Sequence, residues 1–465
     1  MTSPSLSRTA LAGLLLVGGG VMTSCMVGPD YETPLTEMPA SYRYDSRKNG
    51  REAARRDDWW KVFHDGGLNR LISDVRSSNH DLKAGVKRVE QARAIVRLAA
   101  ADAYPQLSAS PSISRNRSSD EIAMGGGTGN LFSAPLSASW EIDLFGRIRR
   151  GVQAAAADAQ ASEESLNALR LSLEAEAASG YFNLRALDRQ IQIVQSGVDS
   201  RQGSLQLVKD RNELGAVSSL DVSQAEALLA SSEADLAGLR RQRTAQEAAL
   251  AALAGRAAST YHIAADPLDG TPPSVPAGLP AELLRARPDI RGVERQLAAA
   301  NERVGVATAA FYPSVSITGS LGFQAADFEN LFNHGARFWG ISPQVYVPVF
   351  QGGRNKANLA QSQARYEEVL ETYQQTILDA LAEVETRLSA TRLLDTQNAA
   401  QARAVKASAQ ALSTAREQYK GGTTSYLNVL DAERTALDSE RQQALLRGSD
   451  YINTVNLIRA LGGRW

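Results

Sequence analysis

The apolar residues of the chain follow two periods, and the longer one covers most of the sequence. Between positions 187 and 239 they recur in alternating steps of four and three, an average of 3.5 that is typical of a coiled-coil seam. The seam positions are Leu187, Ile191, Val194, Val198, Leu205, Val208, Val222, Ala225, Leu229, Ser232, Leu236 and Leu239, and Arg201 interrupts the series. The pattern predicts a helix from about residue 147 to 214, on the order of 100 Å long. Each half of the chain is therefore expected to contain a long antiparallel helical hairpin, with turns near 215 and 422.

Four shorter segments switch to a period of two. They lie near 104–117, 131–145, 312–324 and 338–350, and their apolar residues alternate mainly with serine, threonine and acidic residues. The clearest series are Leu136, Ala138, Trp140, Ile142 and Leu144, and Val315, Ile317, Gly319, Leu321 and Phe323. One apolar face and one polar face over about ten residues is typical of a strand in a transmembrane barrel. Soluble sandwiches contain similar segments, so the strands taken alone leave that alternative open.

The two halves of the chain are copies of one another. The segment AYPQLSAS at 103 matches FYPSVSIT at 311, and LGAVSSLDVSQAEA at 214 matches GGTTSYLNVLDAER at 421. The offset stays near 208, which indicates a duplication. Six of the sixteen prolines fall between 267 and 288, and proline breaks helix interiors. We therefore predict a first repeat at 58–256, a proline-rich linker at 257–284 and a second repeat at 285–465, each repeat ordered helix–strand–strand–helix.

The N-terminus has the layout of a secretory signal peptide over residues 1–24. Arg8 supplies a positive charge, residues 10–17 form a short apolar run, and small residues lead to Cys25, the only cysteine. The run is shorter than the roughly 20 residues that span a bilayer. Cys25 resembles the modified cysteine of bacterial lipoproteins, which implies a diacylglycerol on its thiol, a further acyl chain on its amine and a lipidated extension over 25–57. By the same resemblance, Met26 in place of aspartate favours the outer membrane; the alternative is an ordinary signal peptide with an unmodified cysteine.

The composition and the absence of known catalytic motifs exclude several classes of protein. The net charge of -1 gives no basic excess for nucleic acid, and the mean hydropathy of -0.26 argues against a helical membrane span after the signal. The four histidines lack metal-ligand spacing, and neither a P-loop nor a G-x-S-x-G motif occurs. We therefore expect neither an enzyme, nor a metal site, nor a cofactor.

Four strands are too few to close a barrel. Open sheet edges are not tolerated in lipid, because each unpaired backbone group costs several kcal/mol. The chain must then pool its strands with copies of itself around an axis along the membrane normal. Three chains would give twelve strands, an even number with room for an aqueous lumen.

With these features the chain resembles the TolC-like outer-membrane efflux proteins, in particular their lipoprotein branch, the NodT family. The segments that carry the resemblance are DWWKVFHDGGLNRLISDVRSSNHDL (58–82), SWEIDLFGRIRRG (139–151), RARPDIRGVERQLAAAN (285–301) and GGTTSYLNVLDAER (421–434). The resemblance implies a mainly helical homotrimer whose twelve-stranded β-barrel continues as a long periplasmic α-helical barrel. It also implies a lipid-anchored outer-membrane channel, fed by an inner-membrane resistance-nodulation-division transporter and a periplasmic adaptor protein.

The same resemblance implies a gate in the second tip motif. The family's constriction falls on Leu427, which would form an apolar ring, and on Asp431, whose three copies would repel each other and favour cations. Asn428 stands where some members carry a second acidic gate residue. Without the resemblance, Asp431 reads as a solvated residue on a helix surface.

The hairpin turns have two interpretations. Gly215, Ala216, Gly421, Gly422 and Thr423 match positions where family members contact the adaptor, and the same residues also suit a turn that simply needs glycine. Asp221, three residues after Ser218, either completes a capping box or pairs with a basic group across the seam as a gate lock; the spacing favours the cap.

Two other functions remain as alternatives. One is the outer-membrane channel of type I protein secretion. The other, from a different class, is a periplasmic adaptor or coiled-coil lipoprotein, although an adaptor has one hairpin and this chain is expected to have two. The transported compound is left open: the methionines at 1, 22, 26, 38 and 124 lie outside the predicted tunnel helices, so no thioether relay indicates metal export.

Overall fold

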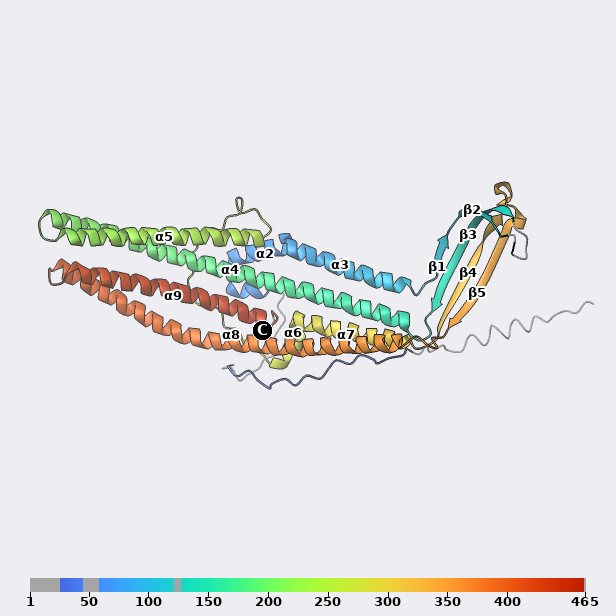
Figure 1. Ribbon diagram of the computed structural model, residues 1–465. Helices are drawn as coiled ribbons and strands as arrows, with labels where there is room; N and C mark the ends of the chain where they lie inside the picture. Colours follow the sequence, from blue (N-terminus) through green and yellow to red (C-terminus); the bar gives the residue numbers. More distant parts are fainter. Residues whose placement is uncertain (1–25, 45–57, 120, 122–126, 464–465) are drawn as a thin grey trace, which may run out of the picture. The chain divides into compact units, whose positions relative to one another are not determined.

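The computed structural model describes residues 26–44, 58–119, 121 and 127–463, so the signal peptide and Cys25 lie outside the described residues. The chain is mainly helical with one small sheet, as predicted. In chain order its elements are η2 (Trp59–Phe63), α2 (Gly66–Ser78), α3 (His80–Ala101), β1 (Gln106–Ala109), β2 (Ser112–Arg117), β3 (Thr128–Ile142), α4 (Arg147–Glu213), α5 (Ser219–Leu253), η3 (Pro280–Glu282), α6 (Leu283–Ala286), α7 (Pro288–Ala309), β4 (Ser314–Ala325), η4 (Phe328–Asn330), η5 (His334–Ala336), β5 (Arg337–Tyr346), α8 (Arg354–Lys420) and α9 (Tyr426–Ala460) (Figure 1). None of the helices in this part of the chain has the apolar length that a membrane span requires.

The chain divides into two compact units. The sheet unit comprises the described residues up to Pro34 together with Glu90–Ala161 and Glu294–Thr372. The hairpin unit comprises the described residues of Leu35–Val89, with Ser162–Val293 and the described residues from Tyr373 onward. Each unit therefore contains residues from both halves of the duplicated sequence.

The sheet is antiparallel, with β3 and β4 in its middle and β1, β2 and β5 outside. Both β1 and β2 pair with β3, and the pairing keeps one register across the gap between them. Pro111 lies in that gap and has no N–H to donate to the ladder, while the Ser110 N–H still donates to the Pro135 carbonyl at 3.3 Å. In physical terms β1 and β2 are one interrupted strand, and the sheet has four strands.

The two faces of the sheet differ in chemistry. On one face Leu136 pairs with Leu321, which pairs with Trp339; on the other Ser139 pairs with Thr318. The apolar face is open, since Leu321 is 58 % exposed and Trp339 is 79 % exposed. Other exposed apolar side chains of this face are Leu107, Ile113, Trp140, Ile341 and Val345. Within the described residues no further strand pairs with the outer edges of β1, β2 or β5.

The hairpin unit contains two helical hairpins, α4 with α5 and α8 with α9 (Figure 1). Most seam positions of the first hairpin are buried, as the 3.5-residue period predicts, and Ile191, Val222 and Leu229 are half-buried. Leu187, Val194, Val198, Leu236 and Leu239 form one apolar cluster. Leu205, Val208 and Ala225 form a second cluster, together with Tyr419, Tyr426 and Val429 of the other hairpin. The seam thus holds each hairpin together and also joins the two hairpins.

Next to these hairpins, η2 and α2 pack into the largest apolar cluster. Trp59 is 2 % exposed, and its indole N–H donates to Glu174 of α4 at 3.0 Å. Arg76 of α2 donates to the other oxygen of Glu174 at 2.6 Å. Burial raises the pKa of Glu174, while the bonds from Arg76 and Trp59 oppose that rise. The N-terminal elements are therefore fixed to α4 by a buried, hydrogen-bonded carboxylate as well as by apolar packing.

The close approach of β3 and β4 leads to a test of the sheet. A Cβ atom added at Gly322 would collide with the Ala134 carbonyl oxygen of the neighbouring strand, whereas one added at Gly319 meets nothing nearer than 3.8 Å. Overpacking of this kind costs roughly 1–3 kcal/mol. We expect Gly322→Ala to lower the yield of folded protein in outer-membrane fractions several-fold, and Gly319→Ala to leave it unchanged. Equal yields would contradict the register.

Candidate functional site

The free ends of the two hairpins are built alike. The first turn follows α4 with Gly215 at φ 74°, and the second follows α8 with Gly422 at φ 72°. This left-handed conformation favours glycine, so both positions have a structural need for it. Gly421 has no such requirement, because its φ is not positive. Gly215, Ala216, Gly421, Gly422 and Thr423 are all exposed, so the five positions predicted to contact an adaptor lie on an open surface.

Asp221 caps α5. The Asp221 N–H donates to the Ser218 hydroxyl at 3.4 Å, and the Ser218 N–H donates to the Asp221 carboxylate at 3.1 Å. Both arms of the capping box are therefore present. At the equivalent place in the second repeat, Ser425 precedes α9 without a side-chain cap bond.

The three predicted gate residues lie together on the first turns of α9. Asp431 lies four residues after Leu427 and three after Asn428, and all three are exposed, so they share one side of the helix. Asp431 pairs with Arg434 at 3.1 Å, with both side chains about two-thirds exposed. The Asn428 amide donates to the Thr424 hydroxyl at 2.6 Å. The face thus combines an apolar side chain, an amide and a screened carboxylate, and it is open within a single chain.

The opposite face of α9 carries a buried charge cluster that connects the hairpins. Glu433 is 4 % exposed and accepts from Arg416 of α8 at 2.8 Å, and Arg201 of α4 lies 3.9 Å from its other carboxylate oxygen. Arg201 also donates to the Ser232 hydroxyl of α5, so the cluster contacts all four hairpin helices. Burial lowers the pKa of Arg201, and the Glu433 carboxylate counteracts that effect. Burial together with the same carboxylate raises the pKa of Tyr426 to about 12.

Arg211 makes a second contact between the hairpins, close to the turns. Its guanidinium donates to the carbonyls of Tyr419 at 3.3 Å and Lys420 at 3.4 Å. It also lies 4.8 Å from the centre of the Tyr419 ring. A cation near the end of α8 binds carbonyls that have no helical partner and interacts favourably with the helix dipole.

The sequence marks only part of this cluster. Arg201 is visible as the one charged residue at a seam position, and a charge at a buried position signals a partner. Arg416 and Glu433 carry no such signal, because each is one of many charged residues along a long helix. The gate prediction addressed the exposed face of α9 and missed the buried one.

In the sheet unit, the N-terminal segment is held against the end of β3. The Val27 N–H donates to the Phe145 carbonyl at 3.2 Å. Arg150, only 1 % exposed, donates to the Val27 carbonyl at 2.8 Å and pairs with Glu302 of α7 at 2.8 Å. Cys25, two residues before Val27 in the sequence, lies outside the described residues.

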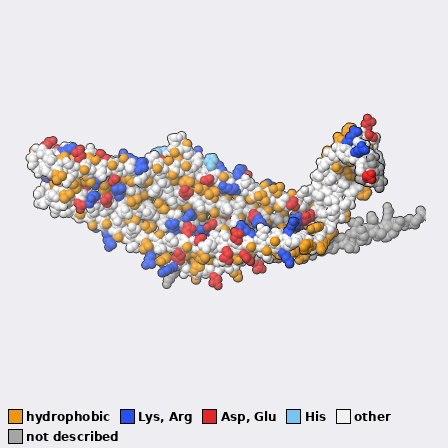
Figure 2. Space-filling view, viewed as in Figure 1, with side chains coloured by type: hydrophobic (Ala, Val, Ile, Leu, Met, Phe, Trp, Pro, Cys, Tyr) orange, Lys and Arg blue, Asp and Glu red, His pale blue; other side chains and the backbone are white. Residues whose placement is uncertain are grey.

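On the face that Figure 2 shows, neither sign of charge dominates. Figure 2 presents a face on which basic and acidic side chains are interspersed along the helices. Among the described residues, no three His, Cys, Asp or Glu side chains gather as a metal site would require.

Residues 71–256 and 279–463 match the family model described as outer membrane efflux protein. The chain belongs to the outer membrane efflux protein family. The resemblance to TolC-like efflux proteins inferred from the sequence is thereby confirmed. Among relatives, the chain is 33 % identical over 453 residues to the cation efflux system protein CusC of Escherichia coli, covering 96 % of each chain. It is 35 % identical over 463 residues to the solvent efflux pump outer membrane protein SrpC of Pseudomonas putida, covering 97 % of each.

Solved structures of the family share the fold. The outer-membrane channel OprN superposes with a TM-score of 0.88 at 33 % identity, covering 94 % of this chain and 99 % of OprN. The open state of the MtrE outer membrane channel of Neisseria gonorrhoeae superposes with a TM-score of 0.83 at 31 % identity, covering 94 % of this chain and 98 % of MtrE. The chain is thus an outer-membrane channel subunit of an efflux system, a transport protein and not an enzyme.

The two faces of α9 should respond differently to substitution. Glu433→Ala leaves Arg201 buried without its carboxylate, which we expect to cost roughly 3–5 kcal/mol. The matched change Asp431→Ala breaks only an exposed pair, worth about 0–1 kcal/mol. Denaturant unfolding of the purified efflux protein measures both. Similar losses for the two variants would show that Glu433 is not a buried link.

Proposed function

We propose that three copies of this efflux protein form one gated channel through the outer membrane. The observation that carries the proposal is the incomplete sheet, whose apolar face is exposed and whose outer edges pair with no other strand of the described residues. The apolar face suits lipid, but the unpaired edges are not stable there for a single chain, because every backbone N–H and C=O in lipid needs a partner. Pairing β5 of one copy with β1 and β2 of the next satisfies both edges, and a three-fold ring closes twelve strands with the polar face inward.

The proposed pore continues into the helical hairpins, whose exposed α9 faces meet near the three-fold axis. Leu427 supplies an apolar ring, and Asp431 supplies a ring of three carboxylates next to Asn428. Like charges at short range repel, and bound cations or protonation relieve that repulsion. The constriction therefore resists passage until the hairpins separate, and it favours cations over anions. Arg434 screens Asp431 in part, since the two side chains are paired at 3.1 Å.

We propose that the exposed hairpin turns are the contact surface for the partner proteins. The small, exposed turn residues Gly215, Ala216, Gly421, Gly422 and Thr423 would contact the helical hairpin of a periplasmic adaptor. The adaptor in turn would contact an inner-membrane resistance-nodulation-division transporter. Small residues allow the close backbone approach that such a contact needs. The names of the relatives include cation, solvent and toluene efflux, so the shared fold does not select a substrate. Type I secretion is the second candidate, because the same conduit would serve it.

Lipid on Cys25 completes the proposal. The Arg150 clamp holds Val27 beside the end of β3, and Cys25 is close to Val27 along the chain. Acyl chains on Cys25 would therefore enter the membrane next to the strands. They contribute about 0.8 kcal/mol for each buried CH₂ group.

Planar-bilayer recording tests the channel and its gate together. Full-length protein should purify in detergent with the mass of a trimer and give cation-selective openings. We expect Asp431→Ala to raise the single-channel conductance or the open fraction several-fold, because the carboxylate ring is lost. Asp199→Ala is the matched control, since Asp199 is an exposed helix carboxylate bonded to Gln195 four residues earlier at 2.9 Å. A monomeric mass removes the barrel proposal, and openings that Asp431→Ala leaves unchanged remove the gate.

Metabolic labelling with radioactive palmitate tests the lipid. The wild-type protein should incorporate label, and Cys25→Ser should incorporate none. Because Arg150 and the strands remain, we expect the variant to keep at least half of the trimer yield. Equal labelling of both proteins would place the acyl chains elsewhere.

A further inference from the structure

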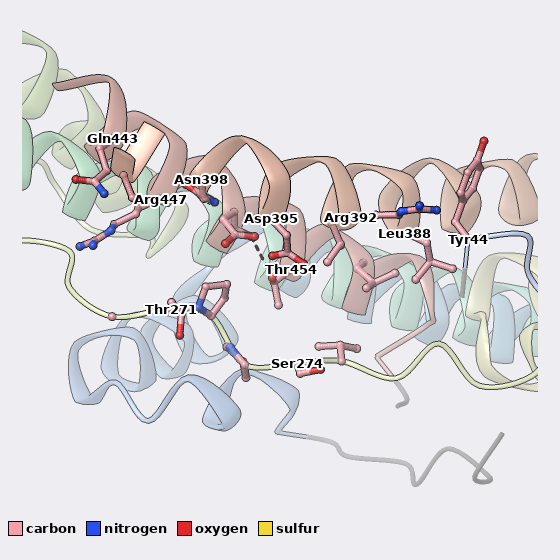
Figure 3. A pocket seen from close by; sticks show the side chains of 18 residues that line it. Tyr44, Thr271, Ser274, Leu388, Arg392, Asp395, Asn398, Gln443, Arg447 and Thr454 are labelled. Carbon is pink, nitrogen blue, oxygen red and sulfur yellow. Dashed lines mark hydrogen bonds between the residues drawn. The ribbon is translucent and has the colours of Figure 1, made fainter. Parts of the chain in front are cut away.

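The hairpin unit contains a cavity that the proposed channel does not use. Its volume is about 540 Å³, and it lies between the proline-rich linker and the helices α8 and α9. Figure 3 shows the linker with Thr271 and Ser274 along one side of the cavity and side chains of the two helices along the other. Small-molecule sites in proteins have volumes of roughly 300–1,000 Å³, so the cavity has the size of a ligand site.

Asp450 of α9 is the unusual member of the lining. It is 8 % exposed, and within the described part of the chain its carboxylate has neither a hydrogen-bond donor nor an ion-pair partner. The Asp450 backbone carbonyl, and not its carboxylate, accepts a hydrogen bond from the Thr454 hydroxyl at 3.0 Å. Asp450 lines the cavity, so a cation held there would pair with a carboxylate that no described residue compensates.

The charged groups around Asp450 do not compensate it. Asp395 faces it from α8, and burial together with that like charge raises the pKa of Asp450 to about 6. Arg392 of α8 and Arg447 of α9 also line the cavity, but neither forms an ion pair with the described residues. Figure 3 shows their guanidinium groups pointing to opposite sides, away from Asp395. The cavity stretch of the linker, Gly270–Val275, carries no charged side chain.

We propose that this cavity binds a small cationic ligand, a protonated amine or a hydrated divalent cation, held between Asp450 and Asp395. Two carboxylates supply the charge that attracts it. The side-chain oxygens of Asn398 and Gln443, which also line the cavity, accept hydrogen bonds from an ammonium group or from metal-bound water. The ligand would rest against both the linker and the helices. The Tyr451 hydroxyl already joins these elements by donating to the Asp269 carbonyl at 3.2 Å, so binding would tighten an existing contact.

Thermal unfolding of the full-length protein in detergent tests the site. At pH 7.5 we expect one cation class to raise the unfolding temperature saturably, by about 2–4 °C. Putrescine and spermidine form one arm and Mg²⁺ and Ca²⁺ the other, with NaCl at matched ionic strength as the baseline. At pH 5.0 the rise should shrink, because Asp450 is then largely protonated. Stabilisation by acid alone, with no saturable effect of either class, overturns the proposal.

Variants separate this site from general charge effects. Asp450→Asn and Asp395→Asn should each weaken the saturable effect at least tenfold. A raised carboxyl pKa means that the folded state binds its proton more tightly than the unfolded state, so stability is lost as pH rises through about 6. Asp450→Asn removes this loss and should raise the unfolding temperature at pH 7.5 without ligand. Asp379→Asn, on an exposed face of α8, should change nothing. If Asp450→Asn keeps the saturable rise in unfolding temperature, the proposed cation site is wrong. The channel itself is tested separately, by the bilayer conductance.

Discussion

The requirement that every backbone polar group in hydrocarbon has a partner governs this protein. In the described residues the four strands leave two outer edges, and water is absent from the bilayer core to satisfy them. In the proposed trimer, copies of the chain pair these edges, and each half of the duplicated sequence supplies two strands. The serine- and threonine-rich face and the apolar face follow from the same requirement, since one must meet water and the other lipid.

The hairpin helices associate through their side chains instead of through backbone pairing. Apolar seams supply most of the packing, but Arg201, Arg416 and Glu433 put charge inside it. A buried ion pair adds little net stability and strongly penalises other arrangements, so the cluster sets how the hairpins align. The opposite face of α9 is exposed and carries Leu427, Asn428 and Asp431, the residues proposed for the gate. One helix thus combines a face that holds its own chain together with a face proposed for the gate.

The linker has a role beyond joining the repeats. Its backbone bonds to α4 through Arg185 and to α9 through Tyr451, so it lies along the hairpin helices and does not loop free. Asp450 lines the cavity beside it, and its carboxylate pairs with none of the described residues. This carboxylate is the group that the proposed cation would bind.

Local periodicity determined much of the architecture, because the spacing of apolar residues follows directly from helix and strand geometry. The hairpins, the four strands and the Ser218–Asp221 cap could all be predicted in this way. Tertiary structure alone decided which strand of one repeat pairs with which strand of the other, that Glu433 is the partner of Arg201, and that Asp450 is buried. These outcomes depend on contacts between residues far apart in the chain. A local sequence pattern cannot predict such contacts. The spacing of apolar residues indicates which face of a helix or strand is buried, but not which residue packs against that face.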